Sequence, residues 1–122
     1  MRTALAVEEP ELARRLVERV EPVTPLARHA LAACRAQLTE VGGDQAEAAG
    51  RYQEAAEGWR EFGNVPERAY ALLGRGRCLA ALGRADAEEP LREARELFVS
   101  LGYKLALAET EALLGEGEAA AV

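Results

Sequence analysis

Residues 51–83, RYQEAAEGWREFGNVPERAYALLGRGRCLAALG, decide the fold of this chain. The stretch contains a long helical pattern, a Gly-Asn-Val-Pro break and a second long helical pattern. The apolar side chains before the break recur at helical spacing: Tyr52, Ala55, Trp59 and Phe62. At the break, Asn64 is a good helix-capping residue and Pro66 suits a first helical turn. We therefore expect two long antiparallel helices joined by a tight turn.

The composition of the whole chain indicates the same structural class. Of its 122 residues, 49% are hydrophobic but only 5% are aromatic, so Ala and Leu supply most of the apolar content. Both are strong helix formers, and β-branched residues are sparse. A chain of this length forms one domain with one hydrophobic core. We expect a single all-α domain over residues 1–122.

Local start and stop signals place about six helices along the chain. Glycines in the turns at 42–43, 63, 83 and 102 end helices, because glycine readily takes the left-handed conformation. Asp-x-x-Glu pairs at 44–47 and 86–89 mark helix starts. The last helix is expected at about 104–114, with Leu105, Ala108 and Ala112 on one face and Gly115 and Gly117 at its end.

The helices form two copies of one pattern. The second helices match at an offset of 39, pairing Tyr52, Trp59 and Gly63 with Leu91, Phe98 and Gly102. The first helices match at an offset of 41, pairing Leu31, Leu38 and Gly42 with Leu72, Leu79 and Gly83. The turn that follows the first helix is therefore expected to be two residues longer in the first copy than in the second. Two helices in a period near 40 are typical of an α-solenoid. We expect repeats at about 24–63 and 64–102, flanking helices at about 9–20 and 104–114, and Trp59 and Phe62 at the seam between repeats.

The segment ALLGRGRCLAALGRADAEEPLREARELF resembles tetratricopeptide repeats. More narrowly, residues 24–115 resemble the C-terminal helical-repeat region of actinobacterial LuxR-type ATP-binding regulators and nucleotide-cyclase-linked ATPases. The resemblance implies a sensor or interaction arm that follows a nucleotide-binding domain. This sequence has neither a P-loop ATPase nor a helix-turn-helix, so we expect an excised C-terminal module or a small stand-alone relative.

Residues capable of catalysis or metal binding are few and scattered. His29 is the only histidine, and Cys34 and Cys78 lie on separate helices outside any CxxC pair. A zinc site needs several converging ligands, and a nucleophilic cysteine needs a base. The Gly-Arg-Gly-Arg run at 74–77 is not a phosphate loop and is better explained by close helix packing, with both arginines on more exposed faces. We expect no catalytic residue, no metal and no cofactor.

The charge balance restricts the class of partner. The net charge is −6, from 21 acidic and 15 basic residues, which argues against direct nucleic-acid binding. The sequence has no apolar run near ~18 residues and no signal-peptide core at its start. We therefore expect a cytoplasmic protein with a protein or peptide partner and no membrane contact.

The best binding candidates lie on the helices that would line the concave side of a repeat stack. Tyr70, Leu73 and Arg77 share one helical face, and His29, flanked by Arg28 and Arg35, occupies the matching face of the first copy. This mixture suits an extended peptide or helix, although an ordinary solvated surface has the same pattern. We expect a non-catalytic interaction or scaffold module.

Two alternatives remain open. Uncapped terminal helices would associate with a second copy through their exposed leucines and valine: Leu12, Leu16, Val17, Leu105, Leu107 and Leu114. A small-ligand sensor would instead have a dry pocket lined by small residues such as Ala32, Ala33, Ala36 and Gly76.

Overall fold

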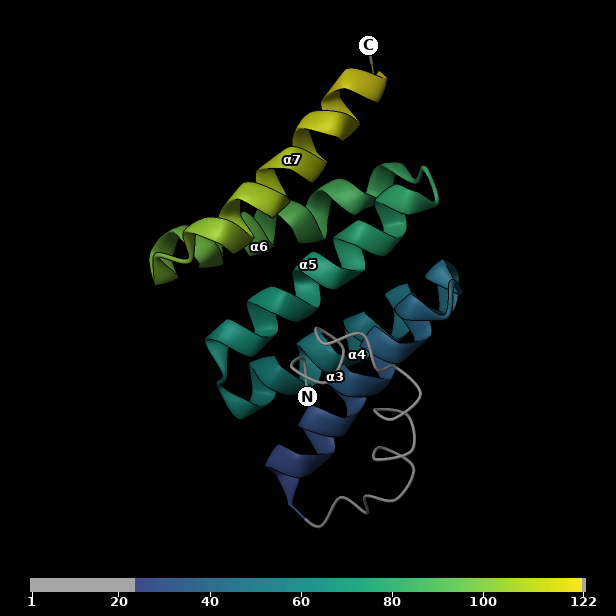
Figure 1. Ribbon diagram of the computed structural model, residues 1–122. Helices are drawn as coiled ribbons and strands as arrows, with labels where there is room; N and C mark the ends of the chain where they lie inside the picture. Colours follow the sequence, from purple (N-terminus) through teal and green to yellow (C-terminus); the bar gives the residue numbers. More distant parts are fainter. Residues whose placement is uncertain (1–23, 122) are drawn as a thin grey trace.

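The computed structural model describes residues 24–121, with side chains as far as residue 117, and its regular structure over this range is entirely helical (Figure 1). The elements are α3 (Pro25–Val41), α4 (Gln45–Phe62), α5 (Val65–Ala81), the short 3-10 helix η1 (Ala85–Ala87), α6 (Glu88–Leu101) and α7 (Lys104–Ala121). The predicted all-α class is confirmed. The described range holds five α-helices, and the sixth predicted helix, at about 9–20, lies outside it.

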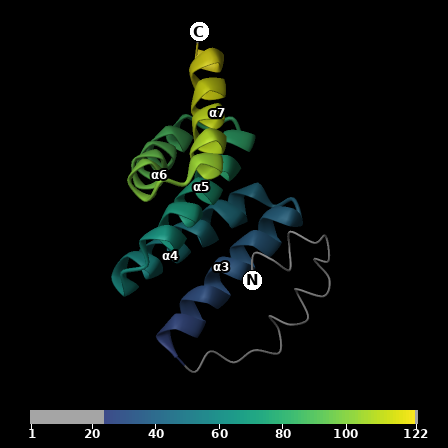
Figure 2. The same cartoon turned by 60° about the vertical axis from the view of Figure 1, so that its left-hand side comes forward.

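Each helix packs against the one before it, and helices two apart in the chain, α3 with α5 and α5 with α7, also touch. Figures 1 and 2 show α5 lying between the α3–α4 pair and the α6–α7 pair. The central helix therefore has neighbours on opposite sides. This explains why α5 has more buried residues than α3, although both are 17 residues long.

Side-chain caps fix where three of the helices begin. Thr24, Asp44 and Asn64 each accept a hydrogen bond from a backbone N–H three residues later, at 3.1 Å in each case. These bonds satisfy N–H groups that have no partner within the helix. The start predicted at Asp86 is wrong, because η1 occupies that turn and α6 begins at Glu88 without a side-chain cap. Asp86 instead pairs with Arg84.

Turn hydrogen bonds show how the two halves superimpose. The N–H of Gly42 donates to the carbonyl of Leu38, and the N–H of Leu82 donates to the carbonyl of Cys78. The left-handed residues are Gly43 and Gly83, with φ of 94° and 71°. The first helices therefore match at an offset of 40, and the predicted 41 is wrong. The hydrophobic pattern gives no unique register, because α5 packs on both sides and is apolar on both.

The offset of 39 predicted for the second helices is confirmed. The carbonyls of Trp59 and Phe98 accept equivalent bonds from the N–H groups of Asn64 and Tyr103. The connection from α3 to α4 is consequently one residue longer than the connection from α5 to α6. The predicted difference of two residues is wrong. The small residues near the start of the second segment of each copy also match at the offset of 39, since Ala48 and Ala87 are both buried.

Gly74 and Gly76 let two neighbours approach α5 closely. A Cβ on Gly74 would lie 2.5 Å from the Tyr52 ring of α4, and a Cβ on Gly76 would lie 2.4 Å from the Leu91 side chain of α6. Residues two apart point to nearly opposite sides of a helix. The Gly-x-Gly spacing thus makes room for a side chain of α4 on one side of α5 and for a side chain of α6 on the other. The prediction of close packing at this motif is confirmed.

The last helix differs from its prediction in length and in face. It continues to Ala121, past Gly115 and Gly117, because glycine within a helix costs only about 1 kcal/mol and alanine and glutamate surround it. Its buried residues are Ala106, Thr110 and Leu114, whereas Leu105 is 91% exposed. Thr110 lies in the core because its hydroxyl donates to the carbonyl of Ala106 at 2.8 Å. The predicted face was wrong because alanine and threonine give a weak hydrophobic signal.

Candidate functional site

A groove of about 570 Å³ opens between α3, α5 and α7, and Tyr52 of α4 also contributes to its lining. We call it the inner groove. Its walls carry alanine and leucine side chains, two tyrosines, one amide, three carboxylates and one guanidinium. The lining residues are Ala33, Gln37, Glu40, Val41, Tyr52, Glu67, Tyr70, Ala71, Leu73, Arg77 and Glu109.

Helical spacing explains why residues far apart in the chain face this groove. Gln37 and Val41 follow Ala33 at intervals of four residues on α3, and Ala71 follows Glu67 by four residues on α5. Residues at this spacing share one face of a helix. The packing of α3 and α7 on either side of α5 then brings the three faces together.

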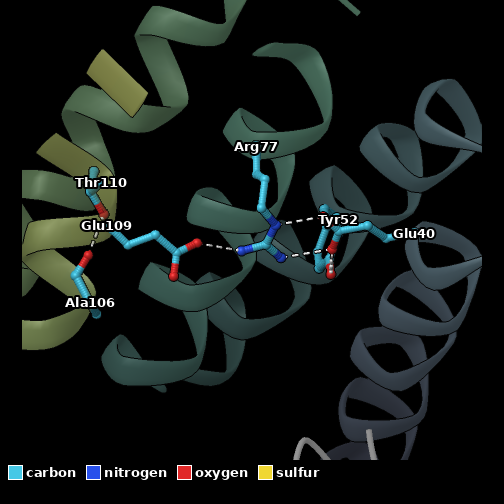
Figure 3. Close-up of polar contacts among 6 residues, drawn as sticks. All are labelled: Glu40, Tyr52, Arg77, Ala106, Glu109 and Thr110. Atoms are coloured by element: carbon cyan, nitrogen blue, oxygen red, sulfur yellow. Dashed lines mark hydrogen bonds and ion pairs between the residues drawn. The ribbon is translucent and has the colours of Figure 1, made fainter. Parts of the chain in front are cut away.

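The Arg77 guanidinium joins the three helices across the groove (Figure 3). Its Nε donates to Oε2 of Glu40 at 2.5 Å and its Nη2 donates to Oε1 of Glu40 at 2.7 Å. Its Nη1 donates to Oε2 of Glu109 at 2.8 Å. The Glu40 carboxylate also accepts a hydrogen bond from the Tyr52 hydroxyl at 2.6 Å. Bidentate charge-assisted bonds of this kind are among the stronger polar contacts in proteins.

The network fixes the protonation state of its members. Burial alone would raise the pKa of Glu40, but the hydrogen bonds from Arg77 and Tyr52 and the Arg77 charge lower it below its usual value. Burial and the hydrogen bond to Glu40 raise the pKa of Tyr52. The hydrogen bond to Glu40 raises the pKa of Arg77 further above its usual range, against the effect of burial. At neutral pH the groove therefore holds a charged Glu40, a charged Arg77 and a neutral Tyr52.

Tyr70 forms an aromatic wall of the groove. Its ring packs edge-on against Phe98 of α6, with centroids 5.2 Å apart, and lies 6.2 Å from Tyr103 at the start of α7. Phe98 is fully buried. The hydrophobic core therefore holds the Tyr70 ring in place from behind, while the residue also lines the groove.

The inner groove carries charges of both signs. Among the described residues that line it, Glu40, Glu67 and Glu109 contribute three carboxylates, and Arg77 contributes one guanidinium. Both Glu40 and Glu109 already pair with Arg77.

Of the six residues predicted for the concave face, three lie together in the groove: Tyr70, Leu73 and Arg77. Leu73 is buried, with 3% of its surface exposed, so it forms part of the floor. Arg77 was expected on a more exposed face, but it is half-buried between two carboxylates.

The other three predicted residues lie outside the lining of the groove. His29 packs against the rings of Trp59 and Phe62, at centroid distances of 5.6 and 5.7 Å. A Cβ on Gly58 would lie 2.5 Å from Nδ1 of His29, so this glycine makes room for the imidazole. Arg28 and Arg35 are exposed.

The acidic residues that surround Arg77 were not predicted from the sequence. Glu40 and Glu109 lie 37 and 32 residues from Arg77, and no local pattern links them. Tyr52 was predicted as part of an apolar stripe, which is correct for its ring, since the residue is 3% exposed. A buried tyrosine hydroxyl usually has a partner, and this was the one available signal of a polar group nearby.

The two cysteines lie in environments that disfavour the thiolate. Cys34 and Cys78 are both buried and unbridged. Burial raises the pKa of the Cys34 thiol, and burial together with the Glu40 charge raises the pKa of Cys78 to about 12. Within residues 24–117, His, Cys, Asp and Glu side chains form no group of three that could hold a metal ion.

Comparison with known proteins gives no match, since no family model, curated protein or solved structure is detectably similar to this chain. The described helices include none that is long and apolar enough to cross a membrane. The geometry of the groove is therefore the main guide to function.

Proposed function

We propose that this chain is a non-catalytic protein-interaction module that binds a peptide segment in the inner groove. In this proposal the helices form a tetratricopeptide-like α-solenoid, with repeats at about 24–63 and 64–102 and the groove on the concave side. The equivalent turns after α3 and α5, and after α4 and α6, support a repeated unit. Solenoids of helix hairpins commonly bind partners along such a face.

The observation that carries the proposal is the groove itself, which residues of α3, α4, α5 and α7 line together. Its volume of about 570 Å³ is within the range of ligand sites in proteins, roughly 300–1,000 Å³. Apolar walls and the fixed Tyr70 ring offer contact area, and the charged groups supply polar recognition. A site with these properties can hold the side chains of a bound peptide.

The resemblance to actinobacterial ATP-binding regulators extends the proposal. In that context the chain would act as a regulatory arm in the cytoplasm, and the groove would bind either a partner protein or another part of the same regulator. A scaffold role follows from the same surface.

Peptide selection with a blocked groove tests the proposal. A random 12-residue peptide library displayed on phage is selected on the immobilised full chain. Enriched peptides are then measured against Ala33→Phe, which fills the groove from α3, and against Ala46→Phe, which adds the same side chain to the exposed start of α4. We expect Ala33→Phe to weaken binding at least tenfold and Ala46→Phe to leave it unchanged. Selected peptides that ignore both substitutions would show that the groove is not the binding site.

Self-association is a second candidate, favoured by an exposed apolar group where α6 meets α7. Val99 is 62% exposed, Leu105 is 91% exposed and Tyr103 is 36% exposed. Of the other leucines expected to pair, Leu114 is buried and Leu107 is partly buried, while Leu12, Leu16 and Val17 lie outside the described residues. Sedimentation velocity tests this candidate: a dimer that Leu105→Lys dissociates supports it, and a monomer at high concentration contradicts it.

A small-ligand sensor is the least favoured role. Ala36 is fully buried, and the space beside Gly76 is filled by Leu91. Of the small residues expected to line a dry pocket, only Ala33 contributes to the inner groove.

A further inference from the structure

We propose that the Arg77 network fixes the register in which the first hairpin, α3–α4, docks on α5. The network then contributes specificity of packing and little net stability. This role goes beyond peptide binding, because it concerns how the walls of the inner groove come to face one another. The evidence is the alanine-rich surface of the hairpin and the directional bonds that cross it.

The buried surface of α4 is rich in alanine and leaves the register of the hairpin open. Four of the six buried residues of α4 are alanines, and the other two are Tyr52 and Trp59. Trp59 packs against His29 inside the hairpin. Tyr52 instead lies beside Gly74 of α5. Alanine has no long side chain to interlock with a neighbouring helix, so registers that differ by one helical turn, about 5.4 Å, bury similar surfaces.

The bonds to Arg77 distinguish between these registers. Its Nε and Nη2 donate to the two oxygens of Glu40, at 2.5 and 2.7 Å. The hydroxyl of Tyr52, in the same hairpin, donates to that carboxylate and orients it. Hydrogen bonds weaken beyond about 3.2 Å, so a slide of one turn takes the carboxylate out of the bidentate geometry. The Glu40 side chain is only 16% exposed, so solvent compensates the separated charge in part.

The other neighbour of α5 docks without a polar pair. At the offsets of 40 and 39, Ala80 and Leu91 correspond to Glu40 and Tyr52. Only one of the four buried residues of α6 is an alanine. Leu91 fills the space beside Gly76, and Phe98 packs on a tyrosine ring of α5. Large apolar side chains therefore fix the register on this side, whereas the polar network is present where such side chains are few.

The energetics of buried ion pairs agree with a role in specificity. The cost of desolvation offsets most of the attraction, so the net stabilisation is small, although removing one partner alone is costly. In coiled coils a single buried polar residue fixes the register at the expense of stability. Register matters here because Ala33, Gln37 and Val41 of α3 line the inner groove opposite Tyr70 of α5. A slide of one turn would change the shape of the groove.

Replacing the whole network with apolar side chains of similar size tests the stability part of the proposal. The triple variant is Glu40→Met, Tyr52→Phe and Arg77→Met. Glu109 keeps its contact with water, since its side chain is 49% exposed. The comparison variant is Arg77→Met alone, which leaves the Glu40 carboxylate without its cation. In urea unfolding we expect the midpoint of the triple variant at or above that of the wild type, and the midpoint of Arg77→Met below it.

Spin labels report the register itself. Gln53→Cys on α4 and Glu96→Cys on α6 place two labels on exposed positions, while Cys34 and Cys78 are buried and react poorly. Distances between the labels are measured by electron–electron double resonance. The wild-type background should give one narrow distance distribution. The triple variant should give a broader distribution or a second population, shifted by up to about 5 Å, one helical turn.

A label pair within the first hairpin provides the control. With Arg35→Cys on α3 and Gln53→Cys on α4, the distribution should stay narrow in both backgrounds. If it broadens in the triple variant, the hairpin itself has loosened and the proposal is overturned. An α4–α6 distribution in the triple variant equal to that of the wild type would also overturn it, because apolar packing alone would then fix the register. A triple variant that unfolds in less urea than the wild type, or does not fold, would show that the network mainly stabilises.

Discussion

The first hairpin, α3–α4, and the second hairpin, α5–α6, share a backbone plan but differ at the positions that make the site. Their first helices both span 17 residues and their turns make equivalent hydrogen bonds. At the offsets of 40 and 39, Glu40 and Tyr52 correspond to Ala80 and Leu91. The polar pair of the first hairpin is therefore an apolar pair in the second. Caps and glycines determine the backbone, whereas individual side chains determine where a site forms.

The aromatic clusters of the two hairpins differ in a related way. Trp59 packs with His29 and Phe62 inside the first hairpin. Its counterpart Phe98 packs with Tyr70, which lines the inner groove. Tyr52 contacts Gly74 across the seam between the hairpins. Trp59 and Phe62 were predicted at this seam, but their ring contacts are with His29 and with each other, inside the first hairpin. The groove is thus supported by the second aromatic cluster and by Tyr52, while Trp59 stabilises the first hairpin.

The largest expected effects come from truncating the two aromatic centres. Trp59 is 2% exposed and Phe98 is fully buried, so Trp59→Ala and Phe98→Ala should each cost about 3–5 kcal/mol in the free energy of unfolding. Hydrogen exchange should show lost protection mainly in α3 and α4 for Trp59→Ala. Phe98→Ala should also weaken peptide binding, because Tyr70 loses its support. Equal loss of protection throughout the chain in both variants would contradict this distinction.

Exchanging the polar pair for its apolar counterpart is the next test. Glu40→Ala removes the main partner of a half-buried guanidinium and should destabilise the protein by about 2–3 kcal/mol in urea unfolding. Tyr52→Leu should cost about 1–2 kcal/mol, since it removes one hydrogen bond and the ring that packs on Gly74. The double variant should cost less than the sum by about 1 kcal/mol, because the two side chains interact directly. Strict additivity would mean that the hydrogen bond contributes nothing.

The glycines of α5 can be compared with one on α4. Gly74→Ala and Gly76→Ala should each destabilise the protein by about 1–3 kcal/mol, because the new methyl group meets Tyr52 or Leu91. Gly50 is exposed in the interior of α4 with open space around it, so Gly50→Ala should stabilise by about 0.5–1 kcal/mol. Thermal unfolding measures all three. If Gly74→Ala and Gly76→Ala also stabilise, the helices are not in close contact there.

The smallest expected effect is a dependence of stability on pH. The pKa of Glu40 is lower in the folded protein than in the unfolded chain, where a glutamate titrates at about 4.3. The stabilisation is therefore fully present above that value and is lost as pH falls through the folded pKa. In urea unfolding, the difference between wild type and Glu40→Gln should shrink as pH falls below about 4. A constant difference would show that Glu40 does not titrate with folding.

Much of the fold followed from local signals in the sequence. The caps at Thr24, Asp44 and Asn64 and the stops at Gly63 and Gly102 appear at the predicted positions. The candidate site was only half predictable. Tyr70, Leu73 and Arg77 were placed on one face by helical spacing, while the carboxylates that define the groove were missed.

The sequence by itself determined the all-α class, most helix boundaries and the offset of 39, because capping and turn hydrogen bonds join residues at most five apart. Only the tertiary structure decided the buried face of α7 and the partners of Arg77. Those features depend on which helix faces pack together. Pairing Arg77 with Glu40 and Glu109 requires contacts across 37 and 32 residues, and no pattern along one helix encodes such contacts.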